Sequence, residues 1–317
     1  MAMTLIIKLT VIRKQSSLAK DPVLVKFERR FRPRINQFLR QYLPQDVDQS
    51  TLNRAMNFSV LAGGKRLRPL LTLATLTTLH QPITINVMKA TCALELLHTY
   101  SLIHDDLPAM DDDGLRRSKP TNHAIFGAGM ATLAGDGLLT LAFQWLVDNS
   151  LPDSVQVKLV HALSKAAGPS GMVSGQASDI EFERTQLPLS RLKVLHRHKT
   201  GALIHYAVEA GLIIGHAPHG VVKPMLQFAD HFGLAFQIYD DILDVVGTEE
   251  QLGKPVHQDA AKNTYPNLLG LSGAYRQLAK VLAAGKRNLR SLGQRSKINV
   301  NLLLAFFSYF KVARPSK

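Results

Sequence analysis

The sequence has almost no cysteine and no evident linker. A single cysteine, Cys92, stands among 317 residues, which excludes an intrachain disulfide framework and favours a reducing compartment, so we expect a cytoplasmic protein. We interpret Cys92 as a small buried apolar residue. No Gly/Ser-rich or Pro-rich stretch divides the chain, and 46% of its residues are apolar, which is enough for a large core. We therefore expect one domain over residues 1–317.

Long apolar runs are missing as well. No uninterrupted run approaches the ~20 residues needed to cross a bilayer. Lys8 and Arg13 interrupt the apolar N-terminal segment, which also lacks an evident cleavage site, so a signal peptide is not predicted. We expect a soluble protein without membrane insertion.

Alternating strand patterns are nearly absent, whereas apolar residues recur at spacings of three and four. This periodicity predicts an all-α protein of roughly ten or more helices. The clearest helical segments are 50–62, 70–79, 85–104, 137–149, 153–167, 201–215 and 224–246.

Acidic residues are unevenly distributed in a chain whose formal charge is +14. Residues 260–317 contain eleven Lys or Arg and no acid, and residues 1–42 contain ten Lys or Arg and two acids. Such basic ends occur in proteins that bind nucleic acid or anionic lipid. Here the basic residues are spread along helical patterns, so we favour solvated helix faces and expect no nucleic-acid partner.

A dense acidic cluster stands out against this basic background. In SLIHDDLPAMDDDGLRR, residues 101–117, five of the nine residues from Asp105 to Asp113 are aspartates. Like charges this close repel each other, so the cluster is either a solvated loop or the site of a cation. His98, Ser101 and Asp105 follow one helix face, and Pro108 would break the helix so that Asp111 can return toward Asp105.

A second acidic cluster lies in FQIYDDILDVV, residues 236–246. Gln237, Asp240, Asp241 and Asp244 stand at i, i+3, i+4 and i+7, a spacing that predicts one shared helix face. Apolar residues surround them, which a solvated acidic face would not need. Two carboxylate clusters on separate apolar helices suit Mg²⁺, whose remaining ligands are usually waters and substrate phosphates.

Basic residues accompany the acidic clusters. Lys65, Arg66 and Arg68 follow a Gly-Gly turn at a predicted helix start, a favourable anion site. Arg116 and Arg117 follow the first cluster directly. Any of these residues alone would be interpreted as a surface charge. Together with the two aspartate clusters they predict a site for more than one diphosphate.

Six motifs in order carry a family resemblance. They are GGKRLRP at 63–69, DDLPAMD at 105–111 with its trailing RR, GQASD at 175–179, HKTGAL at 198–203, DDILD at 240–244 and KNTYP at 262–266. Over residues 50–270 the chain resembles the trans-type isoprenyl diphosphate synthases, close to the bacterial farnesyl diphosphate synthases. Residues 1–20 match weakly and are expected to form an N-terminal extension.

The resemblance implies a fold and a reaction. It implies an isoprenoid-synthase helical bundle with a central apolar cavity between two Asp-rich helices, usually assembled as a homodimer. It further implies a prenyltransferase that condenses isopentenyl diphosphate with dimethylallyl or geranyl diphosphate to farnesyl diphosphate. Rivals are a geranylgeranyl diphosphate synthase, which differs in pocket depth, and a terpene cyclase, which generally lacks the GGKRLRP motif. A basic helical polyanion-binding protein would leave both aspartate clusters unexplained.

The resemblance also implies roles for individual residues. Three Mg²⁺ ions, for which Mn²⁺ can substitute, would be held by Asp105, Asp111 and Asp240, with Asp106 and Asp244 as secondary ligands. The diphosphate of isopentenyl diphosphate would be bound by Lys65, Arg68, His98 and Arg117. The allylic diphosphate would be bound by Arg116, Lys199, Lys254 and Lys262. Lys199, Thr200 and Gln237 would lie beside the reacting carbons. The segment after Lys254 is short, with His257 where the family usually has a glycine.

Tyr100 is predicted to set the length of the product. It precedes Asp105 by five residues, about 7.5 Å along a helix, at the position where the resemblance places the floor of the pocket. We predict that Tyr100→Ala makes products of twenty or more carbons where the wild type stops at fifteen, because the lost ring leaves room for further isoprene units. Product chain-length analysis tests this. A simple core tyrosine would instead give lower stability and unchanged products.

Overall fold

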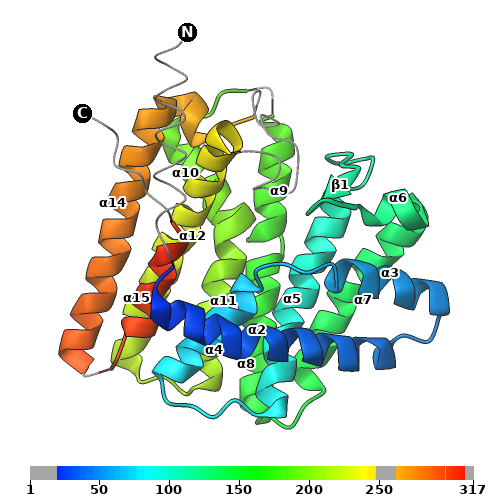
Figure 1. Cartoon of the computed structure of the whole chain (residues 1–317), viewed down its shortest axis with the longest axis horizontal. Coiled ribbons are helices and arrows are strands. Elements are labelled where there is room, and N and C mark those ends of the chain that lie inside the picture. The colour runs from blue at the N-terminus through cyan, green and yellow to red at the C-terminus, as the bar shows by residue number, and fades with distance from the viewer. Residues whose placement is uncertain (1–19, 184, 248–261, 297, 311–317) are drawn as a thin grey trace.

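Helices make up almost all of the structure, a computed structural model that describes residues 20–183, 185–247, 262–296 and 298–310 (Figure 1). This composition confirms the all-α prediction. The helices are α2 (Pro22–Tyr42), α3 (Ser50–Val60), α4 (Leu67–Thr78), α5 (Ile85–Asp105), α6 (Asn122–Phe126), α7 (Ala128–Val147), α8 (Asp153–Ala167), α9 (Met172–Glu181), α10 (Leu189–His196), α11 (Ala202–Ile214), α12 (His219–Val246), α14 (Tyr265–Ser296) and α15 (Asn301–Phe306).

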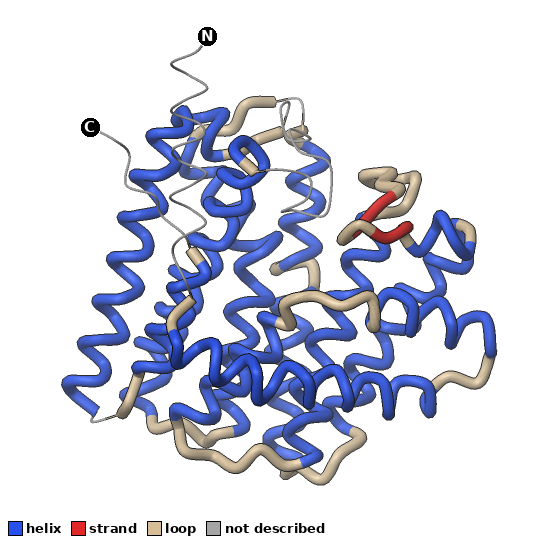
Figure 2. Tube along the Cα trace, viewed as in Figure 1, coloured by secondary structure: helices blue, strands red, loops and turns tan. Residues whose placement is uncertain are grey.

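Only small elements interrupt the helices in the described part of the chain (Figure 2). Two-residue strands, β1 (Leu115–Arg116) and β2 (Lys119–Pro120), pair antiparallel just after the first aspartate cluster. Single 3₁₀ turns lie at Leu43–Asp46 and Phe307–Tyr309, and one π-helical turn spans Arg197–Gly201.

The helices pack as an upright bundle that is crossed by α2 and α3. In Figure 1, α2 and α3 cross in front of the upright helices, which include α5, α7, α11 and α12. Helix α12 packs along α14, α5 along α7, and α4 along α11. The arrangement places α5 and α12, which carry the two aspartate motifs, inside the bundle.

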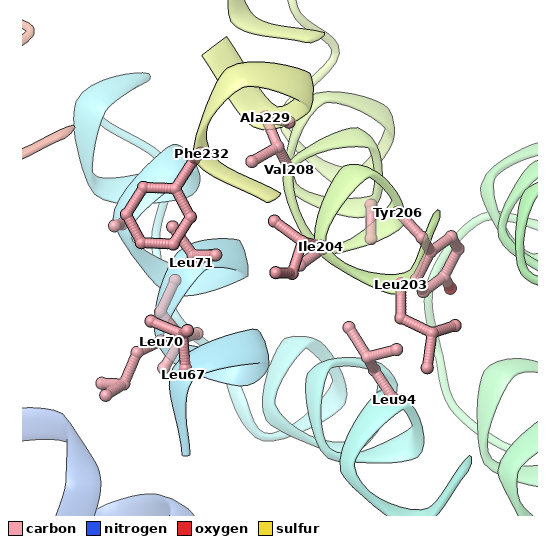
Figure 3. Packing of buried hydrophobic residues seen from close by; sticks show 14 of the residues in the cluster. Leu67, Leu70, Leu71, Leu94, Leu203, Ile204, Tyr206, Val208, Ala229 and Phe232 are labelled. Atoms are coloured by element: carbon pink, nitrogen blue, oxygen red, sulfur yellow. The ribbon is translucent and has the colours of Figure 1, made fainter. Parts of the chain in front are cut away.

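The core gathers where α4, α5, α11 and α12 meet (Figure 3). Leu70 from α4, Leu94 from α5, Ile204 from α11 and Phe232 from α12 are almost completely buried there. Each such side chain contributes about 1.5–3 kcal/mol when it leaves water. Because α5 and α11 are apolar around most of their circumference, they occupy the interior of the bundle rather than its surface.

Helix α5 ends at the first aspartate of the DDLPAMD motif. Thr84 caps its start by accepting a hydrogen bond from the backbone N–H of Val87. The helix ends at Asp105, shortly before Pro108. A proline lacks an N–H and disfavours a helical conformation of the residue in front of it. Asp105 and Asp106 therefore stand at the negative end of the helix dipole, which disfavours carboxylates. A nearby positive charge would therefore stabilise these two carboxylates.

One helix among the described residues is long and apolar enough, by length and composition, to cross a membrane. It is α7, and 44% of its most apolar window is buried inside the structure. Asp136 divides the sequence of α7, so this helix contains no uninterrupted apolar run of that length. Core helices of soluble proteins have the same properties, so α7 is weak evidence for a membrane span.

The arginine between Lys65 and Leu67 is a structural anchor and not part of an exposed anion site. Arg66 adopts a left-handed conformation with φ of 51° and is buried. Its guanidinium donates to Glu95 Oε1 at 2.7 Å, Asn36 Oδ1 at 2.8 Å and the Val60 carbonyl at 2.6 Å. These contacts join the Gly-Gly turn to α2, α3 and α5.

Removing this anchor should destabilise the fold. We predict that Arg66→Met lowers the free energy of unfolding by about 3–5 kcal/mol, because it leaves the Glu95 carboxylate buried without its counter-charge. Urea denaturation measures the change. Arg54→Met, at an exposed position of α3, is the matched control and should stay within about 0.5 kcal/mol of wild type. Equal losses in the two variants would contradict the assignment.

Candidate active site

A cavity of about 430 Å³ opens between α5, α9, α12 and the π-helical turn. Its lining includes ten of the residues predicted from the sequence, namely Arg68, His98, Asp105, Asp111, Arg116, Lys199, Thr200, Gln237, Asp240 and Lys262. The cavity between the two Asp-bearing helices is thus present. Its lining is mostly polar, with Leu102, Met110, Met172 and Leu203 as the apolar contributors, whereas an apolar cavity was expected.

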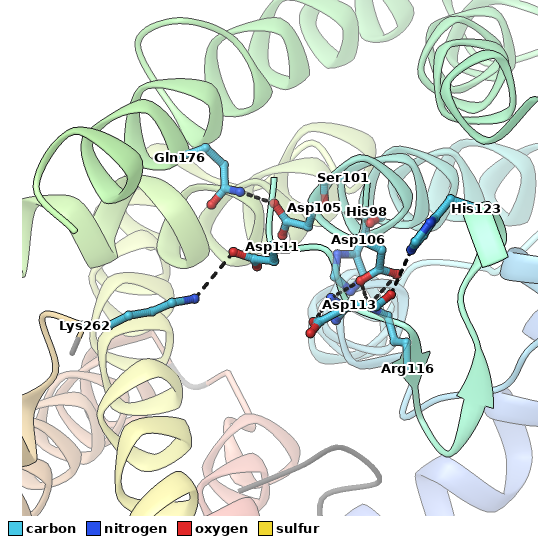
Figure 4. A network of polar contacts seen from close by, with 10 residues as sticks. All are labelled: His98, Ser101, Asp105, Asp106, Asp111, Asp113, Arg116, His123, Gln176 and Lys262. Carbon is cyan, nitrogen blue, oxygen red and sulfur yellow. Dashed lines mark hydrogen bonds and ion pairs between the residues drawn. The ribbon is translucent and has the colours of Figure 1, made fainter. Parts of the chain in front are cut away.

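The first wall comes from the end of α5 and the loop after it (Figure 4). The backbone N–H of Asp111 donates to the Asp105 carbonyl at 2.9 Å, so the chain turns back after Pro108 and brings the two carboxylates to the same wall, as predicted. The Gln176 amide donates to Asp105 Oδ1, and the Lys262 ammonium lies 3.5 Å from Asp111 Oδ1.

The Asp105 carboxyl is harder to ionise than an aspartate in water. Burial, together with the nearby Asp111 and Asp106 carboxylates, raises the pKa of Asp105 to about 6, although Lys199 and Arg116 oppose the change. A buried carboxylate among other carboxylates is costly without a cation. The nearby cations offset this cost only in part, so a further positive charge beside Asp105 would be favourable.

The second wall comes from α12, where the aspartates do not act alike. Asp240 is exposed and lines the cavity, whereas Asp241 and Asp244 are buried. Asp241 still borders the cavity, but both of its oxygens accept hydrogen bonds, from Gln237 Nε2 at 2.8 Å and from the Tyr265 backbone N–H at 3.0 Å. Helical spacing had suggested one shared face. Gln237, Asp240 and Asp241 do line the same cavity, whereas the buried Asp244 does not.

Asp106 is turned away from the cavity toward an arginine. The Arg116 Nε donates to both oxygens of Asp106, at 2.6 and 2.9 Å, and Asp106 is buried. Arg116 also lies 3.6 Å from Asp113 and itself lines the cavity. The two neighbouring aspartates of this motif thus differ in their contacts. Asp105 borders the cavity, whereas Asp106 holds Arg116 in place.

The π-helical turn between α10 and α11 supplies the third wall. Its Lys199 ammonium lies 2.5 Å from Asp179 of α9. Burial acts to lower the pKa of Lys199, but the carboxylates of Asp179 and Asp105 outweigh it and raise that pKa, so the ammonium is charged at neutral pH. Gly175 permits this close packing, because a side chain there would overlap the backbone nitrogen of Lys199.

Two neutral polar groups meet beside Lys199. The Thr200 hydroxyl donates to Gln237 Oε1 at 2.6 Å, which joins the π-helical turn to α12. Both side chains line the cavity. The sequence placed these residues together only through the family resemblance, and the structure brings them into direct contact.

The positive groups surround the carboxylates. Burial lowers the pKa of Arg68 to about 10, so its guanidinium remains charged at neutral pH. Burial, reinforced by nearby arginines, holds the pKa of His98 well below its usual value, so this imidazole is neutral. Arg117, in a left-handed conformation, donates to the Gly63 carbonyl, which joins the two basic motifs.

Several predicted residues do not border the cavity in this structure. Lys65 is exposed at the Gly-Gly turn, and Asp106, Arg117 and Asp244 support neighbouring groups or are buried behind the walls. Tyr100 is buried, and its ring makes an edge contact with His104, with centroids 5.2 Å apart. Lys254, His257 and the short segment 255–261 lie outside the described residues.

Sequence reasoning assigned no role to two polar residues that the structure places in the site. Gln176 contacts Asp105, and Asp179 pairs with Lys199; both line the cavity. The GQASD motif contains both residues, so the signal was present in the sequence. Their partners lie on other helices, which helical spacing within one motif cannot reveal.

The donor set fits magnesium that arrives with a phosphorylated ligand. In the described part of the chain no three His, Cys, Asp or Glu side chains converge closely enough to hold a metal ion by themselves. Mg²⁺ commonly takes one or two protein carboxylates and completes its octahedron with waters and phosphate oxygens. The cavity offers such carboxylates on both walls, from Asp105 and Asp111 on one and from Asp240 on the other. The raised pKa of Asp105 shows that its carboxylate would gain from a nearby cation.

A helical bundle with a cavity between two aspartate-bearing helices defines the isoprenoid-synthase class of all-α proteins. The chain belongs to the polyprenyl synthetase family, whose model matches residues 49–294. The farnesyl diphosphate synthase of Geobacillus stearothermophilus is 52% identical over 80% of this chain and 86% of its own length.

Other relatives extend the comparison. The chloroplastic geranylgeranyl pyrophosphate synthase of Capsicum annuum is 42% identical over 81% of this chain and 71% of its own. A crystal structure of a geranyltransferase from Helicobacter pylori, complexed with magnesium and isoprenyl diphosphate, superposes with a TM-score of 0.84 and 36% identity. It covers 92% of this chain and 99% of that one.

The raised pKa of Asp105 generates a stability prediction for the metal-free chain. Because its folded pKa of about 6 exceeds the unfolded value near 4, the folded state binds the extra proton, and the associated stability disappears as pH rises from about 4 through 6. Asp105→Asn should therefore raise the free energy of unfolding by about 1–3 kcal/mol at pH 7.5 in EDTA, and the gain should vanish near pH 4. Urea denaturation at both pH values measures it. An equal gain at both would show that the charge is not the cause.

Proposed function

We propose that the chain is a prenyltransferase that condenses isopentenyl diphosphate with dimethylallyl or geranyl diphosphate to give farnesyl diphosphate and releases diphosphate. The observation that carries this proposal is the cavity itself. It combines Asp105 at the end of α5 and Asp111 on the loop after it, opposite Asp240 of α12, with the cations Arg68, Arg116, Lys199 and Lys262. The 52% identity to a farnesyl diphosphate synthase supports the same conclusion.

The residues divide the substrates between them. Arg116, Lys199 and Lys262 border the carboxylate side of the cavity and would bind the allylic diphosphate, with Lys254 joining them. Arg68 and His98, with Lys65 after the Gly-Gly turn and Arg117 in the turn between β1 and β2, would bind the diphosphate of isopentenyl diphosphate. Asp105, Asp111 and Asp240 would hold three Mg²⁺ ions, or Mn²⁺ in their place, with Asp106 and Asp244 in support.

The reaction needs charge stabilisation more than it needs a base. Bound magnesium would supply positive charge to the departing diphosphate. As the carbon–oxygen bond of the allylic diphosphate breaks, Lys199 and Arg116 stabilise the negative charge on the leaving group. The oxygens of Thr200 and Gln237 would lie beside the allylic carbons and stabilise the positive charge that develops there. The double bond of isopentenyl diphosphate then forms the new carbon–carbon bond, and the released diphosphate takes the proton that is lost.

We further propose a cytoplasmic homodimer of single-domain chains. The exposed apolar side chains of α7 support the dimer, because Leu133 and Val147 of this helix are 56% and 49% exposed. An apolar helix that is only partly buried within one chain is suited to packing against a second copy. The 42% identity to a geranylgeranyl pyrophosphate synthase makes a twenty-carbon product the second candidate.

A direct assay tests the proposed activity. Purified full-length chain is incubated with labelled isopentenyl diphosphate and each allylic diphosphate, and product length is analysed. We expect a fifteen-carbon product with Mg²⁺, no turnover in EDTA and recovery when Mg²⁺ is added back. A main product of twenty carbons would favour the second candidate, and turnover in EDTA would exclude the metal-dependent reaction.

A matched pair of variants tests the carboxylate wall in the same assay. Asp111→Asn should lower kcat by at least about 100-fold, because it removes charge stabilisation from the site. Asp112→Asn is the control, since Asp112 is also exposed and does not line the cavity, and its left-handed φ of 52° suits asparagine. Similar losses in both variants would contradict the role of Asp111.

A further inference from the structure

A chain of hydrogen bonds with a fixed direction runs through the second aspartate motif. Thr200 Oγ1 donates to Gln237 Oε1 at 2.6 Å, Gln237 Nε2 donates to Asp241 Oδ1 at 2.8 Å, and the Tyr265 backbone N–H donates to Asp241 Oδ2 at 3.0 Å. It connects the π-helical turn, α12 and the first residue of α14.

The direction of this chain originates at Asp241. A carboxylate can only accept hydrogen bonds, so the side-chain amide of Gln237 must turn its NH₂ group toward Asp241. Its oxygen then faces Thr200, whose hydroxyl has to donate. Because Tyr265 is the first residue of α14, its N–H lacks a partner within the helix and is available to hold Asp241.

Asp241 differs in this respect from the aspartate beside it. Asp241 is only 3% exposed and accepts hydrogen bonds at both oxygens, whereas Asp240 is exposed to the cavity. A carboxylate whose two oxygens are already bound to fixed donors is poorly suited to ligate a metal ion. Its contacts suit the orientation of a neighbouring group.

We propose that Asp241 is a positioning residue that holds the amide of Gln237 with its oxygen, and not its NH₂ group, toward Thr200 and the reacting carbons. The inference rests on the proposed function for its chemical consequence. An oxygen carries partial negative charge and stabilises a developing cation, whereas an NH₂ group in the same place would oppose it. The hydrogen-bond chain itself can be tested without any substrate.

Two substitutions reverse and then restore the chain. In Asp241→Asn, the oxygen of the new side chain still accepts the hydrogen bond from the Tyr265 N–H. The NH₂ group of the new side chain then faces Gln237, so the Gln237 amide has to rotate. In Gln237→Glu, two carboxylates face each other. In the double variant, the introduced glutamate accepts from both Thr200 and the introduced asparagine, so every bond has a donor and an acceptor again.

The expected results form a double-mutant cycle. Both single variants should lose thermal stability in the absence of substrate and metal, and the double variant should recover most of the loss. Asp241→Asn should lower kcat at least about 30-fold, with KM for both substrates and the Mg²⁺ concentration for half-maximal activity within about threefold of wild type. The double variant should regain kcat to within about tenfold of wild type.

Distinct outcomes would overturn the proposal. A rise of about tenfold or more in the Mg²⁺ concentration required by Asp241→Asn would make Asp241 a metal ligand. Recovery of stability without recovery of kcat would mean that these hydrogen bonds have a purely structural role. If stability does not recover, the proposed series of hydrogen bonds does not exist. If the wild type forms no prenyl product, the proposed function fails, and the stability cycle still decides whether Asp241 orients Gln237.

Discussion

The structure depends on keeping like charges close together in a partly buried space. Carboxylates from α5 and α12 face one cavity, and several arginines and lysines border the same cavity. Unpaired charges in such surroundings are costly. The fold manages this with ion pairs in the walls themselves, between Arg116 and Asp106 and between Lys199 and Asp179. Each pair fixes a cation at the edge of the cavity and leaves Asp105, Asp111 and Asp240 for a ligand.

The position of the site follows from where the core helices end. Helix α5 is buried along most of its length and delivers Asp105 at its C-terminal end, while α12 delivers Asp240 from within its apolar C-terminal half. Because both helices are fixed by the core around Leu94 and Phe232, their carboxylates are held on rigid elements. Rigid placement of charged groups is what a reaction through a charged transition state requires.

The sequence predicted the helices and the motifs, but not the orientation of individual side chains. Apolar periodicity and Pro108 were enough to predict α5, its end and the return of Asp111. Spacing could not distinguish the exposed Asp240 from the buried Asp241, because the N–H of Tyr265 that donates to Asp241 lies on a different helix. For the same reason Arg66 looked like an anion ligand until its buried contact with Glu95 was visible. Contacts between distant segments decide such roles.

The π-helical turn at Arg197–Gly201 also bears on how the chain tolerates insertions and deletions. A π turn contains one residue more than an α-helical turn, and each residue of a helix corresponds to a rotation of about 100°. Deleting one residue between α10 and α11 would let the two helices continue as one regular helix. The same change would rotate one helix relative to the other, so that Lys199 could not pair with Asp179 while Thr200 reached Gln237. The length of this short segment is therefore constrained by the contacts of Lys199 and Thr200, even though a shorter segment would make a more regular helix.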